Sequence, residues 1–251
     1  MKISAIDMHS HINTASQYDS TEDAGYHADI DWLNQIRIGA FTEKMFISSF
    51  ASVKEPSVIE SENELVFDIC QKNDYLYQWV VIDPRVDGSF LQAKKLLLTK
   101  KCVGIKLHPA YHKYSLEDYA RKLFSFAAEY DAKVLIHANK SESYIVPIAD
   151  KYSNVTFIMA HLNAKDNCHI DAIRMSKHKN IYTDIATSGS VKNRVLEYAV
   201  SQIGSERIMY GTDTYSPGFI RGRVDYALIS QESKDNILRN NALQLWNELL
   251  G

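Results

Sequence analysis

Short apolar runs recur along the chain, and each is followed by a longer stretch with apolar residues at helical spacing. Eight runs are short enough to form one strand each: 3–11, 45–50, 76–83, 103–108, 134–138, 155–161, 180–185 and 207–213. The stretches between them fit helices, for example 57–72, 89–100, 116–130, 166–177 and 191–203. Strands that alternate with helices predict a parallel sheet, and eight such units predict an α/β fold, the (β/α)₈ TIM barrel.

The chain carries no linker that would divide it into domains. No Pro-, Gly- or Ser-rich stretch interrupts its 251 residues, and this length matches the roughly 250 residues of a typical barrel of this kind. We therefore predict one barrel domain over residues 1–251. The longest irregular stretch, about 12–29, predicts a lid over the barrel mouth. Residues 234–250 fit a closing helix.

Composition and charge exclude several classes of partner. The chain has 28 basic and 31 acidic side chains and a pI near 6.3, so it offers no basic surface for nucleic acid or an anionic membrane. Its three cysteines lack metal-site or disulfide-framework spacing, and no run resembles a signal peptide or a membrane span. We expect a cytoplasmic protein with a small-molecule substrate; a homodimer stays open.

Common nucleotide and hydrolase motifs are absent. The chain contains no G-x-G-x-x-G, no Walker A loop, no G-x-S-x-G and no H-E-x-x-H. A dinucleotide-binding open sheet and a serine hydrolase therefore have no motif to support them.

The first run ends in a pair of histidines. His9 and His11 are two residues apart, so a strand directs them to the same face, with Asp7 beneath them. Taken alone, the pair is more typical of two surface histidines at a strand end than of a metal site. Other strand ends change this interpretation.

Three further polar residues end later runs. His137 ends the fifth run, His161 the sixth and Asp213 the eighth. Strict alternation directs each of them into the barrel, together with Leu135, Met159 and Met209 respectively. The carboxyl ends of all strands meet at one mouth of such a barrel, where its sites lie. The sequence therefore predicts a metal site there.

The predicted ligands suit a borderline divalent ion. Three imidazoles and one carboxylate, from His9, His11, His137 and Asp213, are a sensible set for one Zn²⁺, with Mn²⁺ or Fe²⁺ as alternatives. His161 is then an orienting or polarising catalytic group rather than a fifth ligand. Asp213, next to both metal and water, is the candidate general base.

This constellation resembles the amidohydrolase superfamily, and within it the amidohydrolase-related (amidohydrolase-2) branch of TIM-barrel enzymes. The resemblance covers residues 7–246 and rests on D-M-H-S-H, G-I-K-L-H-P, V-L-I-H-A, F-I-M-A-H-L, M-Y-G-T-D and the closing I-L-R-N-N-A-L-Q-L-W. It implies that His9, His11, His137 and Asp213 bind the metal and that His161 lies beside the reacting water. It also implies that the nucleophile is metal-bound water or hydroxide, deprotonated by Asp213.

Lys106 permits three interpretations. It shares the inward face of the fourth run with Gly104 and His108. In binuclear members of the superfamily a lysine at this place is carboxylated and bridges two metals, so a second ion is expected only in that case. Otherwise the ammonium contacts a substrate carboxylate, or the side chain is structural. His108 is a substrate-binding candidate or packs before Pro109.

Two arginines follow the last run. Arg221 and Arg223 could form a fork for an anionic substrate group, and they could equally be solvated residues at the start of the last helices.

We predict a metal-dependent hydrolase that acts on a small amide, ester or lactone with metal-activated water. The alternative is non-oxidative decarboxylation of an aromatic or unsaturated carboxylic acid, which the same constellation serves in this branch; the compact chain favours hydrolysis. A third hypothesis is an inactive barrel that only binds a ligand. The intact ligand set argues against it, because unpaired polar groups at one mouth are costly.

Overall fold

Eight parallel strands follow one another around a single sheet in chain order, as the sequence predicts. The structure is a computed structural model that describes residues 3–13, 27–137, 144–162, 167–187 and 189–250. The strands are β1 (Ala5–Ile12), β2 (Thr42–Ser49), β3 (Leu76–Val81), β4 (Cys102–Leu107), β5 (Lys133–Ile136), β6 (Phe157–Met159), β7 (Ile181–Asp184) and β8 (Ile208–Met209).

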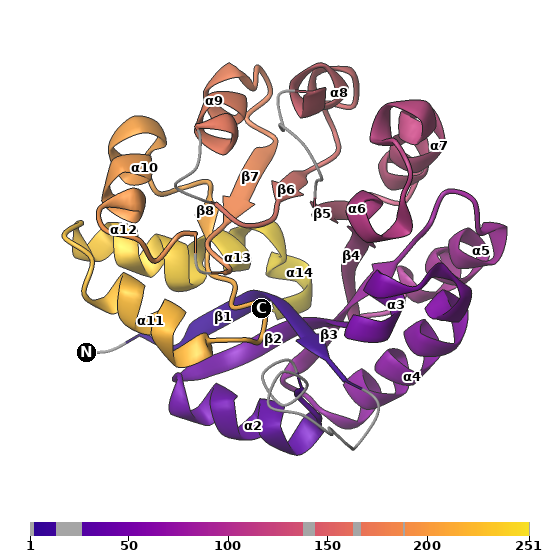
Figure 1. Cartoon of the computed structure of the whole chain (residues 1–251), viewed down its shortest axis with the longest axis horizontal. Helices are drawn as coiled ribbons and strands as arrows, with labels where there is room; N and C mark the ends of the chain where they lie inside the picture. Colours follow the sequence, from indigo (N-terminus) through magenta and orange to yellow (C-terminus); the bar gives the residue numbers. More distant parts are fainter. Residues whose placement is uncertain (1–2, 14–26, 138–143, 163–166, 188, 251) are drawn as a thin grey trace.

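Helices form a ring around the strands (Figure 1). Those between consecutive strands are α2 (Ile30–Gly39), α3 (Phe50–Lys54), η1 (Pro56–Val58), α4 (Ile59–Lys72), α5 (Asp87–Leu96), α6 (Pro109–His112), α7 (Leu116–Glu129), α8 (Ile145–Lys151), α9 (Cys168–Met175) and α10 (Val195–Ile203). After β8 come α11 (Pro217–Asp225), α12 (Gln231–Asp235), η3 (Asn236–Asn240), α13 (Asn241–Leu245) and α14 (Asn247–Leu250). This is a single-domain (β/α)₈ barrel.

Hydrogen bonds between β1 and the segment after Met209 close the barrel. Met8 N donates to Tyr210 O at 3.0 Å, and Thr212 N donates to His9 O at 3.1 Å. The last part of the chain is thereby fixed beside the first. Residues 7–9 and 210–213 consequently share one wall of the barrel mouth.

The barrel interior is filled by alternate side chains of the strands. Met8, Trp79, Leu135, Ile158 and Met209 belong to one buried cluster. The intervening residues face the helices and form the larger outer core. A filled interior leaves the carboxyl ends of the strands as the place for a site.

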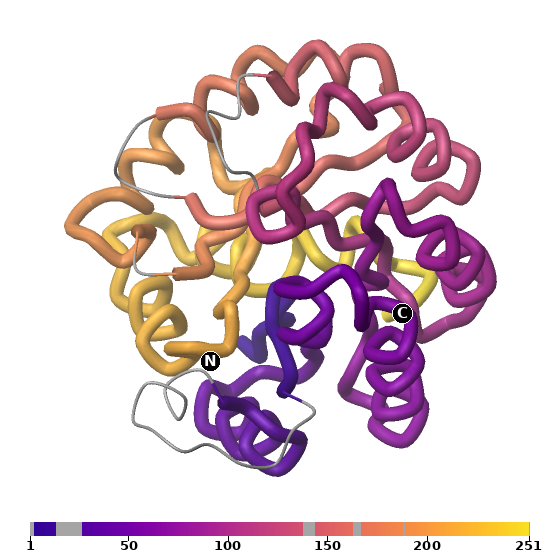
Figure 2. Tube along the Cα trace, turned by 45° about the vertical axis from the view of Figure 1, so that its right-hand side comes forward, coloured from indigo at the N-terminus to yellow at the C-terminus, as the bar shows by residue number. Residues whose placement is uncertain are grey.

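The C-terminal segment closes the opposite end of the barrel, and Figure 2 shows it in yellow, crossing behind the strands. The Trp246 ring packs edge-on against Phe46 and Trp79, with centroids 4.9 and 5.7 Å away, and its Nε1 donates to Val103 O at 2.7 Å. The segment is not the single helix that the sequence predicts. A π-helical turn, η3, interrupts it where the Asn241 amide donates to the carbonyls of Ser205 and Ile208.

The predicted lid at 12–29 lies mostly outside the described residues. Ile12 is the last residue of β1, and the carboxylate of Asp29 accepts from Trp32 N to cap α2. Among the described helices, none is both long and apolar enough to cross a membrane.

The two arginines of α11 lie away from the barrel mouth. Arg221 is 2% exposed and donates to Ile3 O and Phe41 O, which precede β1 and β2, while its Nε donates to Asp225. Its place is therefore at the amino-terminal end of the strands. The guanidinium is used to hold two chain segments together, so the structure does not support the expected contact with substrate.

Arg223 is likewise bound within the scaffold, so it is neither the predicted fork for an anionic substrate group nor a solvated residue. It makes a two-pronged ion pair with Glu197 of α10, whose carboxylate also accepts from Leu228 N at 2.9 Å. The hydrogen bond from Arg223 lowers the pKa of Glu197 from 4.5 to about 2. It outweighs the effect of partial burial, which by itself would raise this pKa.

Because the folded-state pKa of Glu197 is lowered, its contribution to stability is present above pH 4.5 and is lost as the pH falls toward 2. We expect Glu197→Gln to reduce the free energy of unfolding by about 1 kcal/mol at pH 6, with the difference shrinking below pH 4.5. Urea unfolding at several pH values measures this. Glu64→Gln on the exposed face of α4 is the control, and a difference that does not change with pH would contradict the assignment.

Candidate metal centre

An irregularity in β1 directs His9 and His11 into the barrel mouth. Asp7 pairs with Met45 and Ser10 with Ile47, so three steps of β1 match two steps of β2. Such a bulge exchanges the two faces of a strand. His9 therefore lies on the same side as Met8, which belongs to the interior cluster.

Asp7 does not lie beneath the two histidines, contrary to prediction. Its carboxylate accepts from Ser10 Oγ at 2.7 Å and Thr212 Oγ1 at 2.6 Å, on the other face of β1. The bulge explains the difference, because strict alternation would have kept Asp7 with His9. Burial raises the pKa of Asp7 to about 7, against the opposing effect of these hydrogen bonds.

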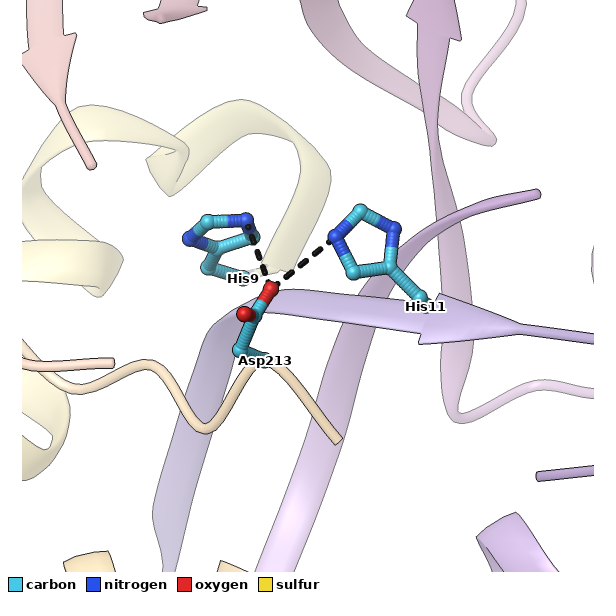
Figure 3. Close-up of side chains that lie close together, drawn as sticks. All are labelled: His9, His11 and Asp213. Atoms are coloured by element: carbon cyan, nitrogen blue, oxygen red, sulfur yellow. Dashed lines mark ion pairs between the residues drawn. The ribbon is translucent and has the colours of Figure 1, made fainter. Parts of the chain in front are cut away.

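Asp213 joins the two histidines. Its Oδ1 lies 3.0 Å from His11 Nε2 and 3.4 Å from His9 Nε2, so both rings direct the same nitrogen toward one carboxylate oxygen (Figure 3). The Asp213 backbone is left-handed (φ 54°), and its N–H donates to His9 O at 2.8 Å. Gly211 permits this close approach, because a Cβ there would lie 2.9 Å from the Cβ of His9.

Nδ1 of each ring, on the side away from Asp213, also has a hydrogen-bond partner. His9 Nδ1 lies 2.8 Å from Oδ2 of Asp184, the last residue of β7, and His11 Nδ1 lies 2.9 Å from Ser48 Oγ of β2. Partners of this kind orient metal-binding imidazoles and increase their basicity. Both Nε2 atoms are therefore aimed at a common position.

His161 reaches the centre by a route that the sequence does not indicate. Ile158 and Ala160 belong to the interior cluster, whereas Met159 packs with the helices outside. The predicted alternation in this strand is therefore wrong, and a continued strand would direct His161 outward. A left-handed backbone at His161 (φ 73°) prevents this, and its ring lies 4.9 Å from that of His9.

His137 lies beside the centre, although it is not part of the closest cluster. The described side chains form two overlapping groups of candidate ligands, one of His9, His11 and Asp213 and one of His9, His161 and Asp184. His137 Nδ1 lies instead 3.0 Å from His161 Nε2. The His137 ring also lies 4.2 Å from that of His108, which stacks on Tyr111 at 4.4 Å. His108 is thus close to the predicted ligands.

Lys106 is fully buried at the centre. Its Nζ lies 2.7 Å from His9 Nε2, the nitrogen that also faces Asp213. Burial lowers the pKa of Lys106 to about 8, although the negative charges of Asp213 and Asp184 oppose the shift. The ammonium form therefore predominates at neutral pH, and the side chain is not exposed at the barrel rim.

Buried carboxylates and neutral imidazoles dominate the electrostatics. Burial lowers the pKa of His9 and His11, and it lowers that of His161 to about 4, so these rings are neutral at pH 7. Burial by itself would raise the pKa of Asp184 and Asp213. Nearby histidines and hydrogen bonds outweigh it, so both carboxylates have lowered pKa values and are ionised.

Sequence reasoning missed Asp184 and Ser48. Asp184 lies near the end of the seventh run as Asp213 ends the eighth, and a carboxylate at a strand end was the available signal. Ser48 gives no such signal, because a serine near the end of a strand is common. Both act on the histidines through contacts between distant parts of the chain.

The arrangement fits a divalent cation. Two imidazole nitrogens and one carboxylate oxygen lie within 4.8 Å of one another in a buried site. Asp184, Asp213 and Lys106 sum to one net negative charge, which favours a cation. Histidine and carboxylate ligands are compatible with Zn²⁺ and Mn²⁺.

Solved structures with the same fold include several decarboxylases. A 5-carboxyvanillate decarboxylase from Sphingomonas paucimobilis is 11% identical, with a TM-score of 0.78 over 98% of this chain and 99% of that one. One from Novosphingobium aromaticivorans, complexed with manganese and 4-hydroxy-3-methoxy-5-nitrobenzoic acid, is 14% identical, with a TM-score of 0.76 over 97% and 96%.

A candidate hydrolase is also among the similar structures. A protein from Pseudomonas putida, described as a candidate 2-pyrone-4,6-dicarboxylic acid hydrolase, is 16% identical, with a TM-score of 0.72 over the full length of both chains. No curated protein sequence was found to match. The amidohydrolase family model matches residues 6–247, from the second residue of β1 into α14. The chain therefore belongs to the amidohydrolase family, in the amidohydrolase-2 branch that its motifs indicate.

Proposed function

We propose that this protein is a metal-dependent enzyme that hydrolyses a small amide, ester or lactone, with Zn²⁺ as the first candidate metal and Mn²⁺ as the second. The observation that carries the proposal is the convergence of His9 Nε2, His11 Nε2 and Asp213 Oδ1, with both rings held from behind. A bound divalent ion supplies a Lewis acid that polarises a carbonyl or carboxylate oxygen and makes water more acidic.

The residues around the ion have separate roles in this proposal. Asp213 directs Oδ1 at the two imidazoles, so its other oxygen is the candidate acceptor for the proton of the attacking water. His161 Nδ1 is buried without a hydrogen-bond partner among the described residues. It is therefore the candidate donor or acceptor toward the reacting group. His137, which contacts His161 Nε2, fixes its ring and is a further candidate ligand.

An anionic substrate fits the charges at the mouth. Lys106 has its ammonium at the centre, and His108 with Tyr111 offers a stacked pair of rings beside His137. The Phe50 ring lies 5.7 Å from that of His11, and Tyr215 packs against Phe50. We therefore propose Lys106 and His108 as the substrate-binding residues. Arg221 and Arg223 are not included.

Non-oxidative decarboxylation is the second candidate. The aromatic rings at the mouth suit a planar carboxylic acid, and the decarboxylases of similar fold include one solved with manganese and a nitrobenzoic acid. Chain length does not separate the two reactions, because the matches to the decarboxylases span nearly the whole of both chains. The type of bond that is cleaved is the distinguishing observation.

We expect about one Zn²⁺ or Mn²⁺ per chain in protein purified without chelator, because the two groups of three candidate ligands overlap at His9. Elemental mass spectrometry measures the content, and chelation is expected to lower Tm by several degrees through linkage. About two ions per chain would instead favour a carboxylated Lys106 as a bridge. No metal, even after Zn²⁺ or Mn²⁺ is added, would end the proposal.

Asp213→Asn is expected to reduce kcat by at least about 100-fold with the fold intact, because the amide cannot accept the proton of water. Steady-state kinetics and circular dichroism measure the two effects. Asp131→Asn is the matched control, since its side chain is 88% exposed and far from the centre in the fold. Undiminished turnover in Asp213→Asn would show that another group is the base.

Isotope incorporation distinguishes the two reactions. With lactones, esters and aromatic carboxylic acids as test substrates, hydrolysis in H₂¹⁸O places ¹⁸O in the product carboxylate, whereas decarboxylation in D₂O places deuterium on carbon and releases CO₂. We expect ¹⁸O incorporation. Deuterium on carbon with CO₂ release would assign the enzyme to the decarboxylases, and neither product with a metal-loaded protein would leave a binding barrel.

A further inference from the structure

The side chain of Asp184 makes further contacts besides the one with His9 Nδ1 described above. Its side chain is completely buried and accepts hydrogen bonds from three segments of the chain. Oδ2 faces His9 Nδ1 at 2.8 Å, while Oδ1 accepts from His161 N at 3.0 Å and Ala186 N at 2.9 Å. One carboxylate thus connects β1, the end of β6 and the end of β7.

The contacts of His9 admit only one neutral tautomer. An ionised carboxylate only accepts hydrogen bonds, so His9 Nδ1 must carry the hydrogen that Asp184 accepts. On the other side, Lys106 Nζ donates to Nε2 at 2.7 Å, which is closer than Asp213 Oδ1 at 3.4 Å, so Nε2 carries the lone pair. Two independent neighbours therefore impose the form in which Nε2 can bind a metal.

His11 is held differently. Its Nδ1 faces Ser48 Oγ, and a hydroxyl can donate or accept. Its Nε2 faces Asp213 Oδ1 at 3.0 Å, which makes Nε2 the donor when no metal is bound. The two histidines of the H-x-H motif thus have opposite tautomers in the metal-free protein. His11 must change its tautomer when a metal binds, and the rotating Ser48 hydroxyl permits this.

The other oxygen of Asp184 acts on the backbone of His161. The left-handed conformation there (φ 73°) turns the ring toward His9, where a regular strand would turn it away. A non-glycine residue is disfavoured in this region, and the surrounding structure must hold it. The hydrogen bond from His161 N to Asp184 Oδ1 is such a restraint.

We propose that Asp184 is the positioning residue of this centre: Oδ2 fixes His9 in the tautomer whose Nε2 can bind a metal, and Oδ1 holds the His161 backbone so that its ring faces the same place. The role rests on the proposed metal centre. It assigns different tasks to the two histidines, since His9 is fixed before the metal binds and His11 adapts to it.

The test compares Asp184→Asn with Ser48→Ala. With its oxygen kept toward His161 N and Ala186 N, the asparagine presents an NH₂ group to His9 Nδ1 and forces the opposite tautomer. We expect Asp184→Asn to weaken Zn²⁺ and Mn²⁺ binding by about 10- to 100-fold in chelator competition. Ser48→Ala removes a hydroxyl that can donate or accept and therefore does not fix the tautomer of His11, so it is expected to weaken binding by only about threefold. Equal losses would overturn the proposal.

Histidine ¹⁵N NMR of the metal-free protein reports the tautomer of each imidazole ring. Replacing a residue with a merely structural role would not change this tautomer. The spectrum is assigned with His9→Gln and His11→Gln. We expect the hydrogen on Nδ1 of His9 and on Nε2 of His11 in the wild type, and a switch at His9 in Asp184→Asn. The opposite tautomer at wild-type His9 would overturn the proposal even if Asp184→Asn fails to fold.

Hydrogen exchange tests the contact with His161. Asp184→Ala is expected to remove the protection of the His161 amide, whereas Asp184→Asn retains an acceptor and keeps it. Unchanged protection in Asp184→Ala would contradict this half of the proposal. If the wild type binds no divalent ion, the proposed function fails, while the wild-type tautomers and the amide exchange still decide the role of Asp184.

Discussion

The ring of His9 lies between the Asp184 carboxylate and the Lys106 ammonium. The rest of the centre depends on which atoms donate and which accept in these two hydrogen bonds. Asp184 is ionised because histidines and backbone N–H groups surround it, despite complete burial. Lys106 supplies the positive charge on the other side of the ring. A buried ion is stable only where such partners are present. The polar mouth of this barrel is therefore a connected network in which each group requires the next.

The barrel provides this network with a rigid support and also with local irregularities. The interior is filled by apolar side chains, and Trp246 seals the amino-terminal end of the strands. Departures from regular backbone occur at the mouth: the bulge in β1 and the left-handed residues His161 and Asp213. Strain of this kind is found where function requires a side chain in a particular place, and it persists because hydrogen bonds hold it.

Solved structures that share this fold are described with different activities. Proteins only 11–16% identical share the barrel over nearly the whole chain, and their descriptions include both decarboxylases and a candidate hydrolase. The shared scaffold brings strand ends together, while the groups around them select the reaction. In this chain those groups include Lys106 at the centre and a stacked His108–Tyr111 pair beside it.

The sequence by itself determined the barrel and most of the centre. Alternating apolar runs fix the eight strands, and polar residues at strand ends, from His9 to Asp213, must then meet at one mouth. This inference requires only the local periodicity of each segment and the rule that parallel strands share an edge.

The tertiary structure decided everything that depends on contacts between distant segments. Alternation alone misplaced Asp7 and Met159, because a bulge and a left-handed turn are stabilised by partners elsewhere in the chain. It could not show that Asp184 holds His9 across 175 residues, or that Arg221 binds carbonyls ahead of β1 and β2. Periodicity reports which face a residue occupies, whereas the hydrogen-bond partner of a buried polar group depends on which strands become neighbours.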